Sequence, residues 1–341
     1  MEHKTGFSKL IFQENYKEKI ADLKKIKPTI ISNPIQEDPN YSLLDYTIGY
    51  KLEAIENIAS HRLNAKDGLE EARKVIILGY DESKIKFLAL EGTAFFTTHT
   101  LVIVGNDDYL PITLFTINFY TKSKKLVEKS SFIRYSENPS IDSELDYIAE
   151  RNEFLSFWGE KNSIMFIDGP FIGGNITSYN LNLIDNLLQK NIIPIFFVKN
   201  STSNLVVNNI PELKGNFNSD LHWLHHFLES GTRSNIFKYT DEHNSANSKI
   251  FFYIKTLRNI SPQRVEMHPK VFSLIEDHFP EMINLIYYLL LVHGERSNLQ
   301  IRPIAIAEMF SRESMRLTNF TKMFNSMQFI PTMNQIRFGG K

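Results

Sequence analysis

Three carboxylate residues lie within or directly after segments that have the pattern of a strand or a helix. Glu91 in "LALEGT" and Asp168 in "SIMFIDGPFIGG" each follow an apolar run and each precede a glycine. Glu150, in "AERNEF", lies within a stretch that has the spacing of an amphipathic helix. Carboxylate oxygens are the ligands of hard divalent cations, and a pair of such cations can hold the attacking and leaving oxygens of a phosphodiester. The three residues are therefore candidate ligands of Mg²⁺ or Mn²⁺.

Each of these motifs also has a plainer interpretation. A carboxylate followed by glycine at the end of a strand is a common turn, and a glutamate on a helix usually faces solvent. An α/β protein whose carboxylates are only turn and surface residues stays open as an alternative. The arrangement of the surrounding elements decides between the two interpretations.

The order of predicted elements favours a particular fold. Three successive strands are expected from "KIKFLALEGTAFF", "THTLVIVGNDD" and "PITLFTINFYTKSKK". A helix ("IDSELDYIAERNEFLSFWGEK"), a buried strand ("SIMFIDG"), a second helix ("YNLNLIDNLLQK") and a further strand ("NIIPIFFVKN") follow. Three antiparallel strands and then α-β-α-β is the ribonuclease H-like order, so we expect an α/β fold with a mixed sheet flanked by helices. In that fold the metal ligands come from the first strand, the first helix, the fourth strand and a late helix. Glu91, Glu150 and Asp168 occupy the first three of these predicted positions.

The rest of the chain is organised around this segment. Residues 1–73 predict an N-terminal helical arm, with a helix over "YSLLDYTIGYKLEAIENIASHRL". Residues 74–310 form the predicted ribonuclease H-like domain, in which 200–248 is a polar insertion. Two more strands are expected at "KIFFYIKTL" and "QRVEMH", and helices at 271–293 and 301–328. Residues 311–341 are the C-terminal helix and tail.

Composition narrows the class of protein. The 341 residues carry 38 Lys and Arg against 39 Asp and Glu, so a nucleic-acid interface has to be a local basic region. The absence of cysteine excludes disulfides and thiolate chemistry, which fits a cytoplasmic protein. No apolar run is long enough for a transmembrane helix, and we expect no membrane partner.

Two basic features have alternative interpretations. Lys199 follows a strand and is either a point charge for a scissile phosphate or a solvated turn residue. His222, His225 and His226 share one helical face, but no carboxylate completes a metal motif, so a surface role is favoured.

At the carboxylates the sequence resembles the NurA nuclease family. "LALEGT" and "MFIDGPF" are similar to its two strand motifs, and Glu150 precedes Asp168 by 18 residues (168 − 150). Four further segments follow in the family's order. They carry Lys199 and Ser203 in "IIPIFFVKNSTSNLV", Gly231, Arg233 and Ser234 in "HHFLESGTRSNIF", Arg264 and Glu266 in "PQRVEMH", and His293 in "INLIYYLLLVHGER".

The resemblance implies a metal-dependent DNA nuclease that processes DNA ends in repair or anti-phage defence. It implies Glu91, Glu150 and Asp168 as metal ligands, with Lys199 and His293 assisting, and Lys199, Arg233 and Arg264 at the DNA. It also implies a homodimer and a HerA-like hexameric ATPase as partner. Glu91 stands where the family has aspartate, and Leu285 where it has tyrosine. These departures motivate an alternative, a catalytically weakened adaptor that binds DNA and the translocase.

Overall fold

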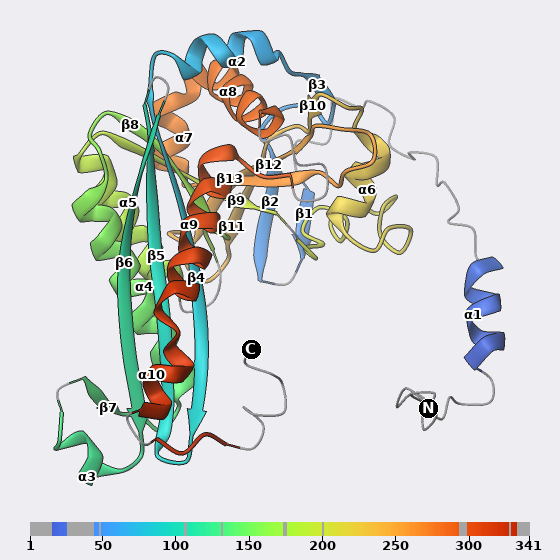
Figure 1. Ribbon diagram of the computed structural model, residues 1–341. Helices are drawn as coiled ribbons and strands as arrows, with labels where there is room; N and C mark the ends of the chain where they lie inside the picture. The colour runs from blue at the N-terminus through green and yellow to red at the C-terminus, as the bar shows by residue number, and fades with distance from the viewer. Residues whose placement is uncertain are drawn as a thin grey trace, which may run out of the picture.

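The computed structural model describes nine stretches of the chain (Figure 1): 16–25, 44–47, 49–105, 108–130, 132–172, 176–199, 201–292, 299–326 and 329–332. In these stretches, no helix is both long and apolar enough to cross a membrane. Helix α1 (Tyr16–Lys25) lies within the predicted N-terminal helical arm.

A long antiparallel meander forms one end of the sheet, as predicted. Its strands are β4 (Ile76–Ala89), β5 (Gly92–Val104) and β6 (Tyr109–Thr121). Strand β4 is longer than expected, because the polar segment "YDESK" continues the strand. A short parallel strand, β7 (Ile133–Tyr135), follows helix α3 (Lys124–Val127) and extends the edge.

The α-β-α-β segment then returns to the first strand of the meander. Helix α4 (Pro139–Trp158) leads to β8 (Ser163–Asp168), and helix α5 (Thr177–Gln189) leads to β9 (Ile192–Val198). Strand β8 lies parallel to β4 on one side and to β9 on the other. The resulting strand order, β9-β8-β4-β5-β6, confirms the ribonuclease H-like mixed sheet expected from the sequence.

The sheet continues beyond β9 into a second half. Strand β13 (Gln263–Met267) pairs with β9, and β12 (Ser248–Lys255) pairs with β13, so both predicted strands are present. The predicted insertion contributes helix α6 (Asp220–Phe227) and two strands, β10 (Thr232–Arg233) and β11 (Phe237–Asp241).

The helix predicted from the segment that begins at "YSLLDYT" is wrong. The described part of this segment forms strands β1 (Leu44–Thr47), β2 (Tyr50–Ala54) and β3 (His61–Arg62). Strand β2 pairs with β11 and buries Leu52 against the aromatic core beside α6. Tertiary pairing with a free sheet edge has overridden a helical spacing of apolar residues.

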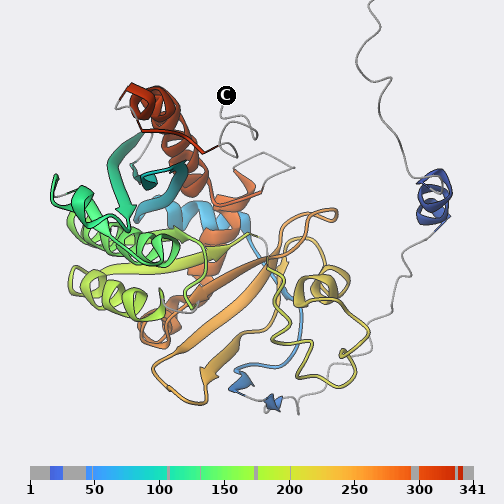
Figure 2. The ribbon, with the colours of Figure 1, turned by 90° about the horizontal axis from the view of Figure 1, so that it is seen from below.

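Helices cover both faces of the sheet. Helices α4 and α5 lie on one face, and α9 (Arg302–Thr318) runs along β4 and β5 on the other (Figures 1 and 2). The predicted domain boundary at residue 310 falls inside α9, and the three-part division stays a prediction. The remaining helical elements are α2 (Ala65–Ala72), α7 (Pro269–Ile275), a 3₁₀ turn (Glu276–His278), α8 (Phe279–Leu291) and α10 (Phe320–Ser326).

Candidate active site

Parallel pairing of β4 with β8 brings two aspartates together at the centre of the sheet. Tyr80 of β4 stands opposite Ile167 of β8, so the next residues, Asp81 and Asp168, are neighbours on the same face. Each carboxyl group affects the pKa of the other, as expected for neighbouring side chains. Asp168 ends its strand, and Gly169 after it adopts φ +100°, a conformation that favours glycine and turns the chain away from the sheet.

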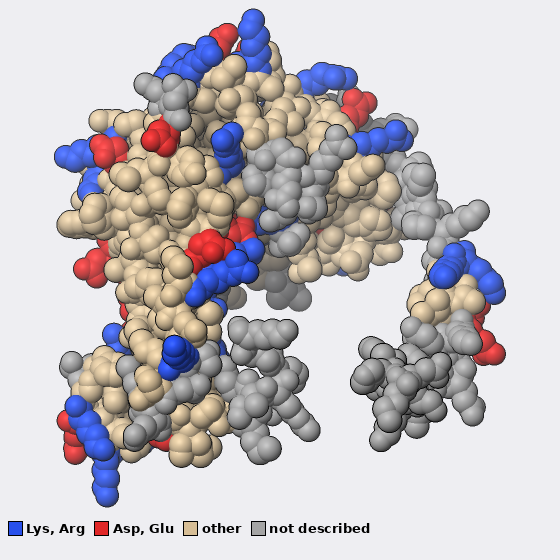
Figure 3. Space-filling view, in the orientation of Figure 1, with Lys and Arg blue, Asp and Glu red and all other residues tan. Residues whose placement is uncertain are grey.

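A lysine and a glutamate complete this group of charges. The Lys199 ammonium, just after β9, lies 3.2 Å from Asp168 Oδ2 and 3.2 Å from Glu308 Oε2 on α9. Gln300 donates to the same glutamate oxygen at 2.7 Å, and Arg312 forms an ion pair with the other oxygen. Over α9, acidic and basic side chains lie side by side (Figure 3). We name Asp81, Asp168, Lys199 and Glu308 the aspartate cluster.

Burial governs the protonation of the aspartate cluster. Burial, followed by the negative charges of Asp168 and Glu82, raises the pKa of Asp81 to about 9. Burial also raises the pKa of Asp168, although the Lys199 ammonium opposes this. Burial lowers the pKa of Lys199, but Asp168, Asp81 and Glu308 outweigh it and raise the pKa overall. Two carboxylates so arranged hold a shared proton unless another cation replaces it.

The two aspartates suit a divalent cation. Mg²⁺ is commonly held by one or two carboxylates, with waters and substrate phosphates completing its octahedron. In the stretches that the structure describes, no three Asp, Glu or His side chains converge on a common metal position. Asp81 and Asp168 are therefore the residues that would hold the ion, and the site depends on substrate or water for the remaining ligands.

The structure does not bring Glu91 to this site, which corrects the prediction of a first-strand ligand. Glu91 lies in the turn between β4 and β5, ten residues beyond Asp81 (91 − 81), or on the order of 30 Å along the strand. Its Oε2 accepts a hydrogen bond from the Ile330 amide at 3.1 Å. The following Gly92 has a packing reason to be small, because a Cβ there would lie 2.3 Å from the Tyr120 carbonyl oxygen.

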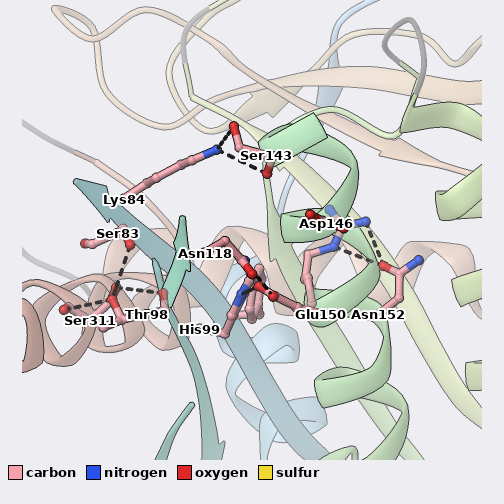
Figure 4. Close-up of polar contacts among 12 residues, drawn as sticks. Ser83, Lys84, Thr98, His99, Asn118, Ser143, Asp146, Glu150, Asn152 and Ser311 are labelled. Atoms are coloured by element: carbon pink, nitrogen blue, oxygen red, sulfur yellow. Dashed lines mark hydrogen bonds and ion pairs between the residues drawn. The ribbon is translucent and has the colours of Figure 1, made fainter. Parts of the chain in front are cut away.

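Glu150 lies on the other face of the sheet, in a second polar cluster (Figure 4). Asn118 donates to its Oε1 at 2.8 Å, and His99 Nε2 is 3.8 Å from its Oε2. His99 pairs in turn with the Tyr80 hydroxyl at 2.8 Å. Burial alone would raise the pKa of Glu150, but His99 and Asn118 stabilise the anion and lower the pKa overall. The structure thus separates Glu150 from the Asp81–Asp168 pair.

The two arginines predicted at the DNA are engaged within the protein. Arg233 forms a bidentate contact with Glu56 and lies over the ring of Phe279, 5.7 Å from its centroid. Arg264 is buried in β13, where its Nε lies 2.8 Å from Glu266 Oε1 and its Nη1 donates to Ser201 at 2.7 Å. Both guanidinium groups therefore have a structural role in this conformation.

Glu266 connects the two loops that flank the aspartate cluster. It is fully buried, and its Oε2 accepts the Phe171 amide at 2.8 Å, in the loop that follows Asp168. Its Oε1 pairs with Lys249 at 2.6 Å and with Arg264, which holds Ser201 in the loop after Lys199. Lys249 and Arg264 favour the charged form and keep the pKa of Glu266 low despite its burial. This buried ionic network fixes both loops relative to β13.

The remaining predicted residues are not part of the aspartate cluster. His293 lies outside the described residues. His222, His225 and His226 do lie on one helix, α6, as their spacing predicts, and none belongs to a metal-binding group among the described residues.

Sequence reasoning missed Asp81 and Glu308. Gly79, Asp81 and Ser83 in "ILGYDESKIKF" are residues that favour turns, so the local sequence conceals that the strand continues through Asp81. Glu308 resembles any glutamate on an amphipathic helix, because only the docking of α9 on β4 brings it to Lys199. Gly79 permits that docking, since a Cβ there would lie 2.3 Å from the Pro303 carbonyl carbon.

Comparison with known proteins shows the family to which the chain belongs. The NurA domain matches residues 98–307. Among solved structures, the NurA nuclease from Sulfolobus solfataricus is 12% identical, with a TM-score of 0.49, over 79% of this chain and 88% of that one. A NurA structure with manganese is 8% identical, with a TM-score of 0.33, over 71% and 87% of the two chains.

An endonuclease V from Bacillus subtilis is 10% identical, with a TM-score of 0.38, over 72% of this chain and 83% of that one. No curated protein matches the sequence. The domain match begins after β4, at Thr98, and covers more than half of the chain through the strands and helices that surround Asp168 and Lys199. The chain belongs to the NurA family.

Proposed function

We propose that this protein is a metal-dependent nuclease that hydrolyses DNA phosphodiesters, with Asp81 and Asp168 holding Mn²⁺ or Mg²⁺. The observation that carries the proposal is the pair of buried aspartates on adjacent parallel strands, with Lys199 at 3.2 Å from one of them. Membership of the NurA family supports it, as does the solved NurA relative described as bound to manganese and dAMP.

Each residue of the aspartate cluster has a separate role in the proposed reaction. When bound, the cation supplies charge that polarises the phosphate and lowers the pKa of a coordinated water. Asp81 and Asp168 would hold the ion at the carboxyl end of β8, where Gly169 leaves open space beside the chain. Lys199 offers a point charge to a phosphate oxygen, and Glu308 keeps its ammonium beside Asp168. Glu266 holds the two flanking loops in register.

The proposal extends to partners through the family. A DNA substrate, a homodimer and a HerA-like hexameric ATPase are what the NurA resemblance implies, in repair or anti-phage defence. The resemblance gives Glu150 as a metal ligand and His293 as an assisting residue, and both roles stay proposals for the loaded enzyme. A cytoplasmic location accords with a chain that contains no cysteine.

The adaptor alternative loses its main motivation. It rested on Glu91 replacing a first-strand aspartate, and Asp81 supplies an aspartate on that strand. Leu285, its other motivation, is buried in the apolar core as a packing residue of α8.

Cleavage of linear and single-stranded DNA in Mn²⁺, in Mg²⁺ and in chelator tests the proposal, without and with the ATPase. We expect metal-dependent cleavage by the wild type and a loss of roughly 100- to 1,000-fold in Asp168→Asn, the size of effect seen when a transition-state charge interaction is removed. Asp185→Asn is the matched control, because Asp185 is an exposed aspartate on α5 that is paired only with Lys270 among described residues. Equal rates in Asp168→Asn and the wild type would reject the assignment.

A further inference from the structure

A cavity of about 470 Å³ lies at the C-terminal end of α6, apart from the aspartate cluster. The end of α6, the loop that leads to β10, and the loop between β12 and β13 form its walls. Its polar lining is mostly basic: His225, His226, Lys255, Arg258, Ser230 and Asn259. Ligand pockets commonly enclose roughly 300–1,000 Å³, so this volume suits a small ligand or part of a larger one. We name it the α6 pocket.

The α6 pocket has little negative charge of its own. Glu229 is the carboxylate in its lining, and Arg62 of β3 pairs with that carboxylate at 3.2 Å. The imidazoles, the ammonium and the guanidinium of the lining therefore face the cavity without an equal number of anions. A protein with a formal net charge of −1 gathers here a local positive surplus.

Lys255 is built into the wall. Its side chain is almost fully buried, and its ammonium donates to the Leu228 carbonyl at 3.0 Å and to the His225 carbonyl. These carbonyls, at the C-terminal end of α6, hold the ammonium in place. Arg258 is exposed and forms no hydrogen bond or ion pair with any residue in the described stretches. It is available to a ligand.

The pKa values of the two histidines in the α6 pocket reflect the same surplus of positive charge. Burial lowers the pKa of His225, and the positive charges of Lys255 and His226 lower it further. Burial lowers the pKa of His226 as well, with contributions from His222 and Lys255. Like charges thus oppose protonation of both imidazoles, and a bound anion would reverse this effect.

The position of the pocket relates it to the aspartate cluster. Strands β9 and β12 are both antiparallel to β13, so they run in the same direction. Val198 of β9 is level with Arg264 of β13, which is level with Tyr253 of β12. Lys199, just after β9, and Lys255, the last residue of β12, therefore lie at the same edge of the sheet, with two strand spacings, or about 10 Å, between their strands. Their side chains point to opposite faces at that edge, because Lys199 is one residue past Val198 and Lys255 is two residues past Tyr253.

From this combination we propose that the α6 pocket binds a phosphate group. Phosphate oxygens accept hydrogen bonds from the kinds of group that line this pocket, which are a guanidinium, an ammonium and two imidazoles. Hydroxyl and amide donors lie beside these groups. The phosphate belongs either to a nucleic-acid strand that crosses this edge of the sheet or to a free nucleotide or inorganic phosphate. Only the first of these sources rests on the proposed nuclease function.

Binding to the full-length protein in chelator tests the proposal, because chelator removes any contribution of a metal at the aspartates. The probes are inorganic phosphate and dAMP, measured by calorimetry, and a fluorescent single-stranded oligonucleotide, measured by anisotropy. We expect Arg258→Gln to weaken binding of at least one of them about tenfold. Arg73→Gln is the matched control, since it removes an exposed arginine next to α2. It should bind as the wild type does.

The pattern of losses identifies the source. Weakening of the oligonucleotide alone indicates a strand contact, and weakening of dAMP or phosphate indicates a free ligand. Binding should also be tighter at pH 5.5 than at pH 8, because an anion favours charged His225 and His226. His222, Glu229, Arg62, Lys255 and Arg258 face these two histidines from the surrounding elements.

Two results would overturn the proposal. One is the absence of binding by every probe in the wild type, and the other is an equal loss in Arg258→Gln and Arg73→Gln. Failure of DNA cleavage with intact phosphate binding would remove the proposed function and leave the pocket standing. Because Arg258 is exposed and unpaired with described residues, its loss should not unfold the protein, which thermal melting checks.

Discussion

Strand β4 has an acidic residue at its centre, Asp81, and another just after its end, Glu91, and the two lie in different surroundings. Asp81 is buried between β5 and β8, beside a second aspartate and a lysine from other elements. Glu91 lies in the turn that follows the strand and accepts a backbone hydrogen bond near the C-terminal segment. Both are carboxylates that a motif could select, but only Asp81 is placed by strand register next to Asp168. Register, more than local sequence, assembles this site.

Asp81→Asn should have the largest effect on activity. It keeps the shape of the side chain and removes the charge that would hold the cation, so we expect DNA cleavage in Mn²⁺ to fall roughly 100- to 1,000-fold. Glu91→Gln should stay within about twofold of the wild type, as surface changes usually do. Cleavage rates of both variants under identical conditions give the comparison, and the reverse ranking would return the ligand role to Glu91.

Glu150→Gln extends the comparison with Asp81→Asn to the opposite face of the sheet. Its carboxylate lies with His99 and Asn118 on the face opposite the aspartate cluster. We therefore expect it to lose less cleavage activity than Asp81→Asn, through disturbance of α4 packing. A loss as large as that of Asp81→Asn would mean that α4 approaches the aspartates when the cation binds.

Glu266→Gln should have the largest effect on stability. It leaves the buried Lys249 and Arg264 without their shared anion, which costs about 3–5 kcal/mol in buried ion pairs. Urea unfolding of the metal-free protein measures the change, and exposed Glu281→Gln is the control. An unfolding free energy equal to that of the wild type would mean that the network does not hold the two loops.

Lys199→Met should reduce catalysis less than either aspartate substitution. It removes the point charge beside Asp168 and keeps much of the apolar length, so we expect about a tenfold loss in kcat/KM. Lys270→Met removes an exposed lysine that is paired with Asp185 and serves as the reference. If both variants lose activity equally, Lys199 has no special position at the phosphate.

Metal-free stability should depend on pH through Asp81. Its pKa of about 9 in the folded protein is above the ordinary value for an unfolded chain, so the folded state binds the extra proton. This contribution to stability is fully present below about pH 4 and is lost as the pH rises to about 9. The melting temperature should therefore fall less between pH 6 and pH 9 in Asp81→Asn than in the wild type. Equal slopes would show that Asp81 does not carry the proton.

Much of the fold follows from local sequence. The meander, α4, β8, α5 and β9 each have a pattern that is complete within one element, and their order alone indicates the ribonuclease H-like sheet. Strands β1 and β2 were missed because their place at the edge of β11 is a long-range pairing, which a helical apolar spacing in "YKLEAIENIA" conceals.

The site was only partly predictable, for a related reason. Asp168 follows a buried strand and Lys199 follows the next parallel strand, so the carboxyl ends of β8 and β9 place them together. Asp81 depends on the register of β4 against β8, and Glu308 depends on how α9 docks on β4. Neither relation is contained in the residues next to Asp81 or Glu308 in the chain.

Titration of the metal-free protein with Mn²⁺ tests the central claim most directly, because it does not require activity. Calorimetry on the wild type, Asp81→Asn and Glu91→Gln compares the centre of β4 with the turn that follows it in one experiment. We predict that the wild type and Glu91→Gln bind Mn²⁺ alike and that Asp81→Asn binds it at least tenfold more weakly. Unchanged binding in Asp81→Asn, or loss of binding in Glu91→Gln, would contradict the assignment of the aspartate cluster as the metal centre.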